Sequence, residues 1–126
     1  MSEPISGRPI VLIVEDEPLV REIIVIELEE AGFEVLEAQT GEEAADAIER
    51  GTRIDLLFTD LRLPGALDGW DVAERARRRD AAMPVIYATG YSQGDERRVP
   101  GSVFLTKPYR IAAVLDAAQT LGVKGV

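Results

Sequence analysis

Four short apolar runs divide the chain, and each of them stops at a polar residue. The runs are Ile10–Val14 before Glu15 and Asp16, residues 54–59 before Asp60, residues 84–88 before Thr89, and Val103–Thr106 before Lys107. Continuous apolar runs of this length are typical of strands that are buried on both faces of a parallel sheet. Because the carboxyl ends of parallel strands lie along one edge, where open α/β sheets bind ligands, the pattern predicts a site built from these polar residues.

The segments between the runs have the spacing of amphipathic helices. After Pro18, an apolar stripe at positions i, i+3 and i+4 extends from Leu19 to Ala31, and Gly32 follows it. Proline is tolerated in the first turn of a helix, and glycine commonly ends one. The same reasoning predicts a strand over 33–37, a helix that opens with a capping box at 40–43 and closes at 51, a helix over 70–79, and a last helix that ends at 122.

The stretch over 90–101 departs from this alternation. Its one aliphatic residue is Val99, and glycines and a proline interrupt it, so it has no apolar stripe with which to bury a full helix. We predict a loop there with at most one or two helical turns. The total is about five strands and four to five helices, and right-handed crossovers then favour a doubly wound sheet with helices on both faces.

Composition limits what the domain can do. The 126 residues, 46% of them hydrophobic, fit one globular domain over 1–126 with its own core, and the net charge of −9 argues against nucleic-acid binding. The chain has neither cysteine nor histidine, which excludes disulfides, Ser-His triads and zinc-histidine sites. No apolar run approaches the roughly 20 residues of a membrane span, so we expect a cytoplasmic protein without a membrane partner.

The polar residues at the strand ends indicate a chemistry. Glu15, Asp16 and Asp60 would converge and repel one another, and a divalent cation such as Mg²⁺ would relieve that repulsion. Mg²⁺ with few protein ligands is typical of phosphoryl chemistry, in which a carboxylate can be the nucleophile. Asp60 is the candidate nucleophile, while Lys107 and Thr89 could bind phosphate oxygens.

The same residues resemble the motifs of two-component response regulator receiver domains. The resemblance covers residues 10–121 and rests on Glu15 and Asp16, on Asp60 with Pro64 and Gly69 after it, on Thr89, and on Lys107 with Pro108. It implies a flavodoxin-like parallel sheet of five strands in the order 2-1-3-4-5. It also implies that Asp60 accepts a phosphoryl group from a histidine kinase or phosphotransfer protein in a Mg²⁺-dependent reaction, as a signalling module rather than a turnover enzyme.

The resemblance also assigns metal ligands. Asp16 and Asp60 would hold Mg²⁺ directly, and Glu15 would hold it through water. Arg62 would contribute its backbone carbonyl. These four residues form the predicted metal site.

The remaining motifs would bind the phosphoryl group and respond to it. Thr89 and Lys107 would bind phosphoryl oxygens, and the Lys107–Pro108 peptide bond would be cis. Phe104 occupies the position of the family's aromatic switch residue, although a core aromatic explains it equally well. Tyr91 could shield the acyl phosphate or pack on its loop, and it is a second candidate switch residue.

Two features depart from the commonest receivers. Gly69 lies nine residues after Asp60, one more than usual, so residues 65–67 are expected to bulge from the loop without changing the ligands. Residues 84–91 resemble the signature of the FATGUY subfamily, with Val85 and Tyr87 in place of phenylalanines. That subfamily implies a shortened or mobile fourth helix and a kinase of the HWE type.

Several functions stay open at this point. The leading hypothesis is a stand-alone receiver whose phosphorylation changes its binding to a downstream protein, with a phosphate sink as the variant that needs no such protein. A Mg²⁺-dependent phosphohydrolase with an aspartyl nucleophile is an alternative, although Arg62 stands where haloacid dehalogenases carry a second aspartate. A receiver-like binding module that is never phosphorylated is the third.

Overall fold

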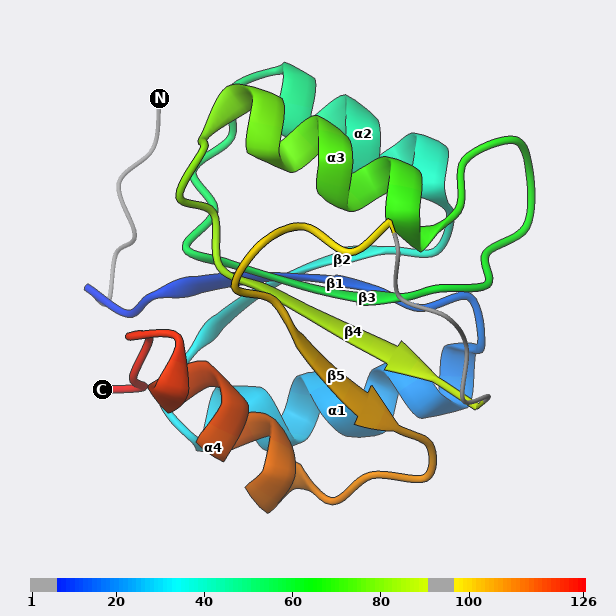
Figure 1. Ribbon diagram of the computed structural model, residues 1–126. Helices are drawn as coiled ribbons and strands as arrows, with labels where there is room; N and C mark the ends of the chain where they lie inside the picture. The colour runs from blue at the N-terminus through cyan, green and yellow to red at the C-terminus, as the bar shows by residue number, and fades with distance from the viewer. Residues whose placement is uncertain (1–6, 91–96) are drawn as a thin grey trace.

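Strands and helices alternate along the chain in the computed structural model, which describes residues 7–90 and 97–126 (Figure 1). The strands are β1 (Ile10–Val14), β2 (Glu34–Ala38), β3 (Leu56–Asp60), β4 (Val85–Thr89) and β5 (Val103–Thr106). The helices are α1 (Pro18–Glu30), α2 (Gly41–Glu49), α3 (Gly69–Arg79) and α4 (Ile111–Thr120). Across the described ranges, no helix is both long enough and apolar enough to cross a membrane.

The five strands form one parallel sheet in the order β2-β1-β3-β4-β5. In Figure 1, α2 and α3 cover one face of this sheet, and α1 and α4 cover the other. This doubly wound, flavodoxin-like arrangement confirms the predicted fold. The strand order reverses between β1 and β3, whose pairing runs from Val11 and Leu56 to Val14 and Thr59. The carboxyl ends of these two strands therefore lie side by side, where such folds bind ligands.

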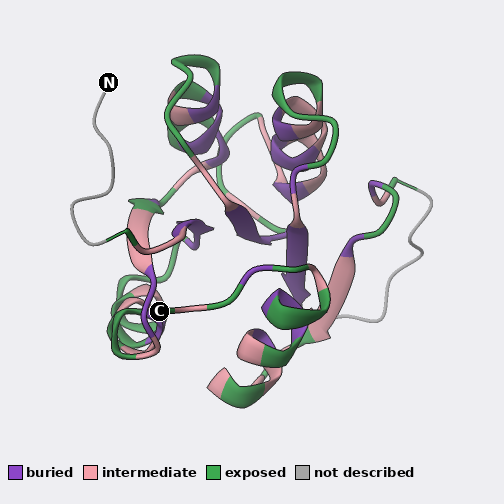
Figure 2. Ribbon diagram, turned by 90° about the vertical axis from the view of Figure 1, so that its left-hand side faces the viewer, coloured by how far each residue is buried: buried purple, intermediate pink, exposed green. Residues whose placement is uncertain are grey.

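Alternate side chains of the buried strands supply two hydrophobic cores, one on each face of the sheet. Leu12 and Val14 of β1 belong to the core that α2 and α3 cover, whereas Val11 and Ile13 belong to the core that α1 and α4 cover. Figure 2 shows buried residues along the strands and on the helix faces that meet them. Because both faces are buried, the register of each strand is fixed, and so is the position of the residue that follows it.

Some element boundaries differ from the sequence prediction. β3 begins two residues later than predicted, because the carboxylate of Asp55 accepts a hydrogen bond from the Ile10 amide (2.7 Å), and β2 and β4 each run one residue later. Thr40 caps α2 as predicted, by accepting from the Glu43 amide (3.0 Å). The Glu43 carboxylate, however, accepts from the Gln39 amide (2.9 Å), so the second half of the predicted capping box is shifted by one residue.

The segment between β4 and β5 is irregular where the structure describes it. Residues 97–102 contain turns but no helix. Val99 is buried, and its amide donates to the Tyr87 hydroxyl at 3.1 Å. The predicted loop also includes residues 91–96, which lie outside the described residues.

Candidate functional site

The carboxyl edge of the sheet brings the predicted site residues together. Glu15 follows β1, Asp60 ends β3, Thr89 ends β4, and Lys107 follows β5. The pairing of β4 with β5 sets Thr89 opposite Thr106. The Lys107 amide then donates to the Thr89 carbonyl at 2.8 Å, which extends the ladder to the site. Four strands thus position the polar groups that the sequence places at their ends.

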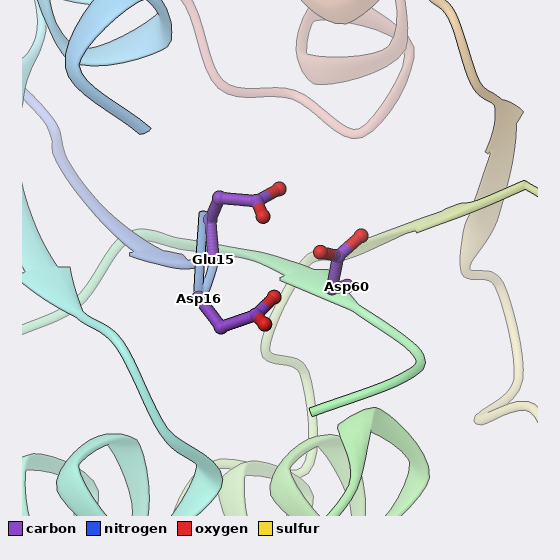
Figure 3. A group of neighbouring side chains, drawn as sticks. All are labelled: Glu15, Asp16 and Asp60. Atoms are coloured by element: carbon purple, nitrogen blue, oxygen red, sulfur yellow. The ribbon is translucent and has the colours of Figure 1, made fainter. Parts of the chain in front are cut away.

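Three carboxylates meet at this edge, and we call them the carboxylate cluster (Figure 3). One oxygen from each of Glu15, Asp16 and Asp60 lies within 4.8 Å of the others. Glu15 and Asp60 are buried, with 3% and 7% of their surface exposed, whereas Asp16 is exposed. Like charges that are partly removed from water repel one another, so the cluster favours a cation.

An ammonium group partly balances these charges. Lys107 Nζ lies 2.7 Å from Asp60 Oδ1 and 3.2 Å from Glu15 Oε1. The Glu17 amide donates to Glu15 Oε2 at 3.0 Å. The Lys107–Pro108 peptide bond is cis, as predicted. Lys107 is therefore in direct contact with two members of the carboxylate cluster.

Burial changes the acid–base behaviour of the central carboxyl group. It raises the pKa of Asp60 to about 7, and Glu15 adds to the rise while Lys107 opposes it. Burial alone would lower the pKa of Lys107, but the hydrogen bond to Asp60 and the charges of both carboxylates outweigh it and raise that pKa. Lys107 therefore stays protonated at neutral pH. Because burial raises the pKa of Asp60, a bound cation would favour its ionised form.

The donor atoms of the carboxylate cluster fit a Mg²⁺ ion. All of them are carboxylate oxygens, which this cation prefers, and their number leaves room for water and a phosphate oxygen. Arg62, predicted to contribute its carbonyl, stands two residues after Asp60 in the loop between β3 and α3. The site can therefore hold Mg²⁺ and still leave coordination positions for a phosphoryl group.

The loop that follows Asp60 returns close to it. The Gly69 amide donates to the Leu61 carbonyl (2.9 Å), and a Cβ atom at Gly69 would stand 2.1 Å from the Asp60 carbonyl oxygen. A residue without a side chain is therefore required at the start of α3. Beside this junction is a hollow of about 420 Å³, lined by Leu61, Arg62, Leu63, Asp68, Trp70 and Thr89. It leaves space next to Thr89 for the atoms of an incoming group.

The predicted switch residue Phe104 belongs to a group of aromatic rings. Its ring stacks on Tyr87, with centroids 5.0 Å apart, and meets Trp70 edge-on at 5.8 Å. The guanidinium carbon of Arg98 lies 4.9 Å from the centre of the Phe104 ring. Phe104 is half-buried there, which fits a core aromatic as well as a switch. Tyr91, the other predicted switch residue, lies outside the described residues.

Two residues outside the predicted set also contribute to the site. Tyr109 borders the same pocket as Glu15 and Asp60, and burial raises the pKa of its hydroxyl group. Arg21 donates to the Glu15 carbonyl at 2.7 Å and so fixes the backbone next to the carboxylate cluster. The sequence contains a signal for Tyr109, because it follows Lys107 by two residues at the same edge of the sheet. The helical pattern of α1 gives no such signal for Arg21.

The fold and this edge define a class of protein. A flavodoxin-like sheet whose carboxyl edge carries clustered carboxylates, a threonine and a lysine is typical of signalling domains that accept a phosphoryl group on an aspartate. The chain belongs to the response regulator receiver domain family, whose model matches residues 11–119. The match confirms the family that the sequence motifs indicate.

Solved structures and curated proteins agree with this assignment. A response regulator receiver protein from Sinorhizobium medicae is 32% identical, with a TM-score of 0.87 over 90% of this chain and 94% of that chain. The response regulator TrrA of Thermotoga maritima, solved in complex with Mg²⁺-BeF, is 28% identical, with a TM-score of 0.80 over 90% of this chain and 98% of that chain. The transcriptional regulator RpaA of Synechocystis is 32% identical over 90% of this chain and 48% of that protein. The chain spans about half the length of the curated relatives it matches first.

Proposed function

We propose that Asp60 accepts a phosphoryl group from a phosphohistidine of a histidine kinase or phosphotransfer protein, in a reaction that requires Mg²⁺. The observation that carries the proposal is the carboxylate cluster, in which Asp60 lies within 4.8 Å of two other carboxylates and 2.7 Å from Lys107. Membership of the receiver family, whose domains are phosphoryl acceptors of two-component systems, supports it. The chain then acts as a signalling module rather than as an enzyme that turns over a substrate.

Each residue of the site has a separate role in the proposed phosphoryl transfer. An oxygen of the Asp60 carboxylate attacks phosphorus while the bond from phosphorus to the donor's imidazole nitrogen breaks, and the nitrogen keeps the electron pair. The ammonium group of Lys107, which contacts Asp60 before the reaction, pairs with an oxygen of the transferred group, and the Thr89 hydroxyl donates to another. The carboxylate cluster and the Arg62 carbonyl would hold Mg²⁺, which would offset negative charge on the transferred group.

An exposed apolar surface beside the site suits the docking of the phosphoryl donor. The apolar side chains of Leu19 and Ile23 on α1 are 74% and 57% exposed. A hollow of about 390 Å³ extends from this face of α1 to the loop after β5, and its lining includes Ile23, Pro108 and Lys107. Because Lys107 also contacts Asp60, a donor helix seated on α1 would bring its phosphohistidine close to the acceptor.

Phosphorylation would then shift the domain between two states and change the surface that it offers to a downstream protein. In this proposal Phe104 turns inward as Thr89 moves toward the phosphoryl group. The domain acts as a stand-alone receiver in the cytoplasm, either through such a partner or as a phosphate sink. The signature at 84–91 and the irregular backbone at 97–102 support a member of the FATGUY subfamily with a kinase of the HWE type.

Intact mass after incubation with Mg²⁺ and acetyl phosphate tests the acceptor. The parent should gain one phosphoryl group, and Asp60→Asn should gain none. An adduct on Asp60→Asn would mean that another residue is the acceptor. Steady hydrolysis of p-nitrophenyl phosphate without a stable adduct would support the phosphohydrolase instead.

The same assay with a histidine kinase as the donor tests the docking surface. Ile23→Arg should slow transfer from the kinase at least about tenfold, the loss expected for one central interface residue. Labelling by acetyl phosphate should stay unchanged, because a small donor needs no docking surface. Equal slowing with both donors would mean that the substitution disturbs the site and not the docking.

A further inference from the structure

We propose that Glu42 is a positioning residue for the Mg²⁺ site. Its carboxylate holds the loop between β3 and α3 in the shape that presents the Arg62 carbonyl to the ion. The inference rests on the proposed function, because it takes Mg²⁺ as the ion and Arg62 as one of its ligands. Glu42 lies on α2 and belongs to none of the motifs that identify the family in this chain. Its role follows from the contacts of the loop.

The two ends of the loop, which spans residues 61–68, are fixed by the sheet and by α3. The Leu61 amide donates to the Ala88 carbonyl at 3.1 Å, and the Leu61 carbonyl accepts from the Gly69 amide at 2.9 Å. Asp68 caps α3 by accepting from the Asp71 amide, and the Asp71 carboxylate accepts from the Asp68 amide, both at 3.0 Å. Neither end can move without loss of these bonds.

The outer part of the loop is held by α2 instead. The Ala66 amide donates to Glu42 Oε2 at 2.8 Å, and this hydrogen bond is the main reason that the pKa of the Glu42 carboxyl lies below its usual value. Gly65 has φ of +93°, and a Cβ atom there would stand 2.8 Å from Glu42 Oε1. A Cβ atom at Gly41 would stand 2.3 Å from the Leu67 carbonyl oxygen. The first two residues of α2 thus contact three successive residues of the loop.

Arg62 lies between the fixed end at Leu61 and the part of the loop that Glu42 holds. Gly69 follows Asp60 by nine residues, one more than in the commonest receivers, so the loop contains an extra residue of backbone, and ordering it costs conformational entropy. A charge-assisted hydrogen bond from a backbone amide to a carboxylate is well suited to offset such a cost. Without it, the Arg62 carbonyl would spend less time where it can share a cation with the carboxylate cluster.

Glu43 offers a matched control that separates this role from a simple effect of charge. Glu42 and Glu43 lie in the same first turn of α2 and carry the same charge. The Glu43 carboxylate accepts from the Gln39 amide at 2.9 Å and so serves the start of the helix rather than the loop. Alanine at either position removes one negative charge, but only the change at Glu42 removes the contact with Ala66.

Mg²⁺ titrations of the parent, Glu42→Ala, Glu42→Gln and Glu43→Ala test the inference. Binding is followed by calorimetry and by the fluorescence of Trp70, the chain's single tryptophan, which lines the hollow beside Arg62. Glu42→Ala should raise the Mg²⁺ Kd about threefold to tenfold, which is at or below the lower limit of about tenfold for residues that orient metal ligands. Glu42→Gln keeps an oxygen that can accept from the Ala66 amide and should recover most of the affinity. Glu43→Ala should stay within about twofold of the parent.

Each result decides between distinct outcomes. If the Kd of Glu42→Ala equals that of the parent, the inference is wrong and the proposed function stands. Equal weakening by Glu42→Ala and Glu43→Ala also overturns the inference, because charge alone then explains the effect. If the parent binds no Mg²⁺, the proposed function fails together with the inference. Thermal melts without Mg²⁺ establish that each variant is folded at the titration temperature, where a loss of stability alone does not change the Kd of the folded form.

Discussion

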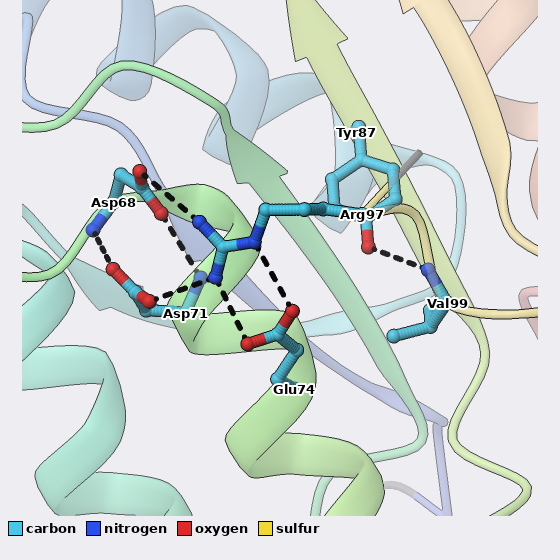
Figure 4. Close-up of polar contacts among 6 residues, drawn as sticks. All are labelled: Asp68, Asp71, Glu74, Tyr87, Arg97 and Val99. Carbon is cyan, nitrogen blue, oxygen red and sulfur yellow. Dashed lines mark hydrogen bonds and ion pairs between the residues drawn. The ribbon is translucent and has the colours of Figure 1, made fainter. Parts of the chain in front are cut away.

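Two groups of carboxylates in this domain each meet a basic side chain, and they differ in their surroundings. At the edge of the sheet, the carboxylate cluster contacts Lys107 through Asp60 and Glu15. Beside α3, a second group contacts Arg97, and Figure 4 shows these contacts. Its members, here called the Arg97 group, are Asp68 at 4.0 Å, Asp71 at 3.0 Å and Glu74 at 2.9 Å. Both groups thus combine three negative charges with one positive charge.

Burial separates the behaviour of the two groups. The side chain of Asp60 is 7% exposed, whereas the carboxylates of the Arg97 group are 31% to 42% exposed. Burial raises the pKa of Asp60 to about 7, but hydrogen bonds from the Asp68 backbone and from Arg97 lower the pKa of Asp71. Water and Arg97 therefore satisfy the exposed group, while the two buried carboxylates of the cluster, Asp60 and Glu15, favour a further cation. The comparison indicates that the burial of Asp60 and Glu15, and not the number of carboxylates, distinguishes the sheet edge as a candidate cation site.

The largest effect is expected from a substitution that displaces the backbone next to Asp60. In Gly69→Ala the new Cβ atom would stand 2.1 Å from the Asp60 carbonyl oxygen, so the start of α3 must move away from the site. We expect a loss of about 3 kcal/mol in the free energy of unfolding, measured by urea denaturation, and much weaker Mg²⁺ binding. Gly90→Ala is the control, because a Cβ atom at Gly90 meets nothing within 4 Å. Similar stability losses in both variants would contradict this explanation.

The second-largest effect is expected in the pH dependence of stability, to which the two groups should contribute with opposite signs. Because the pKa of Asp60 is about 7 in the folded state and near 3.8 in the unfolded state, the folded state binds more protons between these values. Stability without Mg²⁺ should therefore fall as the pH rises from about 4 to about 7, and this slope should be flatter in Asp60→Asn. Asp71 has the opposite sign: its lowered pKa contributes stability above its unfolded pKa that is lost as the pH falls.

Thermal melts over this pH range, with and without Mg²⁺, measure the effect. Mg²⁺ at ten times its Kd should add about 1.4 kcal/mol at neutral pH, because the ion binds the folded state. The gain should shrink in Asp16→Asn, which removes one carboxylate of the cluster. A slope that is the same in the parent and in Asp60→Asn would show that burial of this carboxyl group does not control the site.

The sheet edge could be predicted from the sequence because its residues follow directly after buried strands. Ile10–Val14 is apolar throughout and forms β1 with the predicted boundaries, so the chain itself places Glu15 at the edge. Asp60, Thr89 and Lys107 are positioned in the same way by the ends of β3, β4 and β5. For these residues, local pattern and strand pairing suffice to predict the position.

The Arg97 group and the contact of Glu42 could not be predicted in this way. Arg97 meets Glu74 across 23 residues, and Glu42 meets Ala66 across 24 residues. These contacts depend on the paths of the irregular segments that contain Arg97 and Ala66. Such segments have no regular spacing of apolar residues from which their paths could be predicted. Sequence alone also gives no measure of how far a carboxylate is buried, so the difference in exposure between Asp60 and Asp71 is seen only once the fold is known.

The smallest effect is expected at the exposed group. Arg97→Ala should cost at most about 1 kcal/mol of stability, because ion pairs that are open to water contribute little. The segment 97–102 has other attachments: the Val99 amide donates to the Tyr87 hydroxyl at 3.1 Å, and Arg77 donates to the Pro100 carbonyl at 2.7 Å. Neither contact depends on Arg97, so the segment should keep its place in the variant.

Salt is the test that distinguishes charge from packing at this position. At about 1 M NaCl, where the screening length is about 3 Å, the stability difference between the parent and Arg97→Ala should nearly disappear. Lys124→Ala, which removes one exposed positive charge elsewhere, should have almost no effect at either salt concentration. A difference that salt leaves unchanged would mean that the aliphatic stem of Arg97 stabilises the segment by packing. The contrast would then lie between a buried electrostatic site and an apolar contact, and the comparison between two groups of charges would no longer hold.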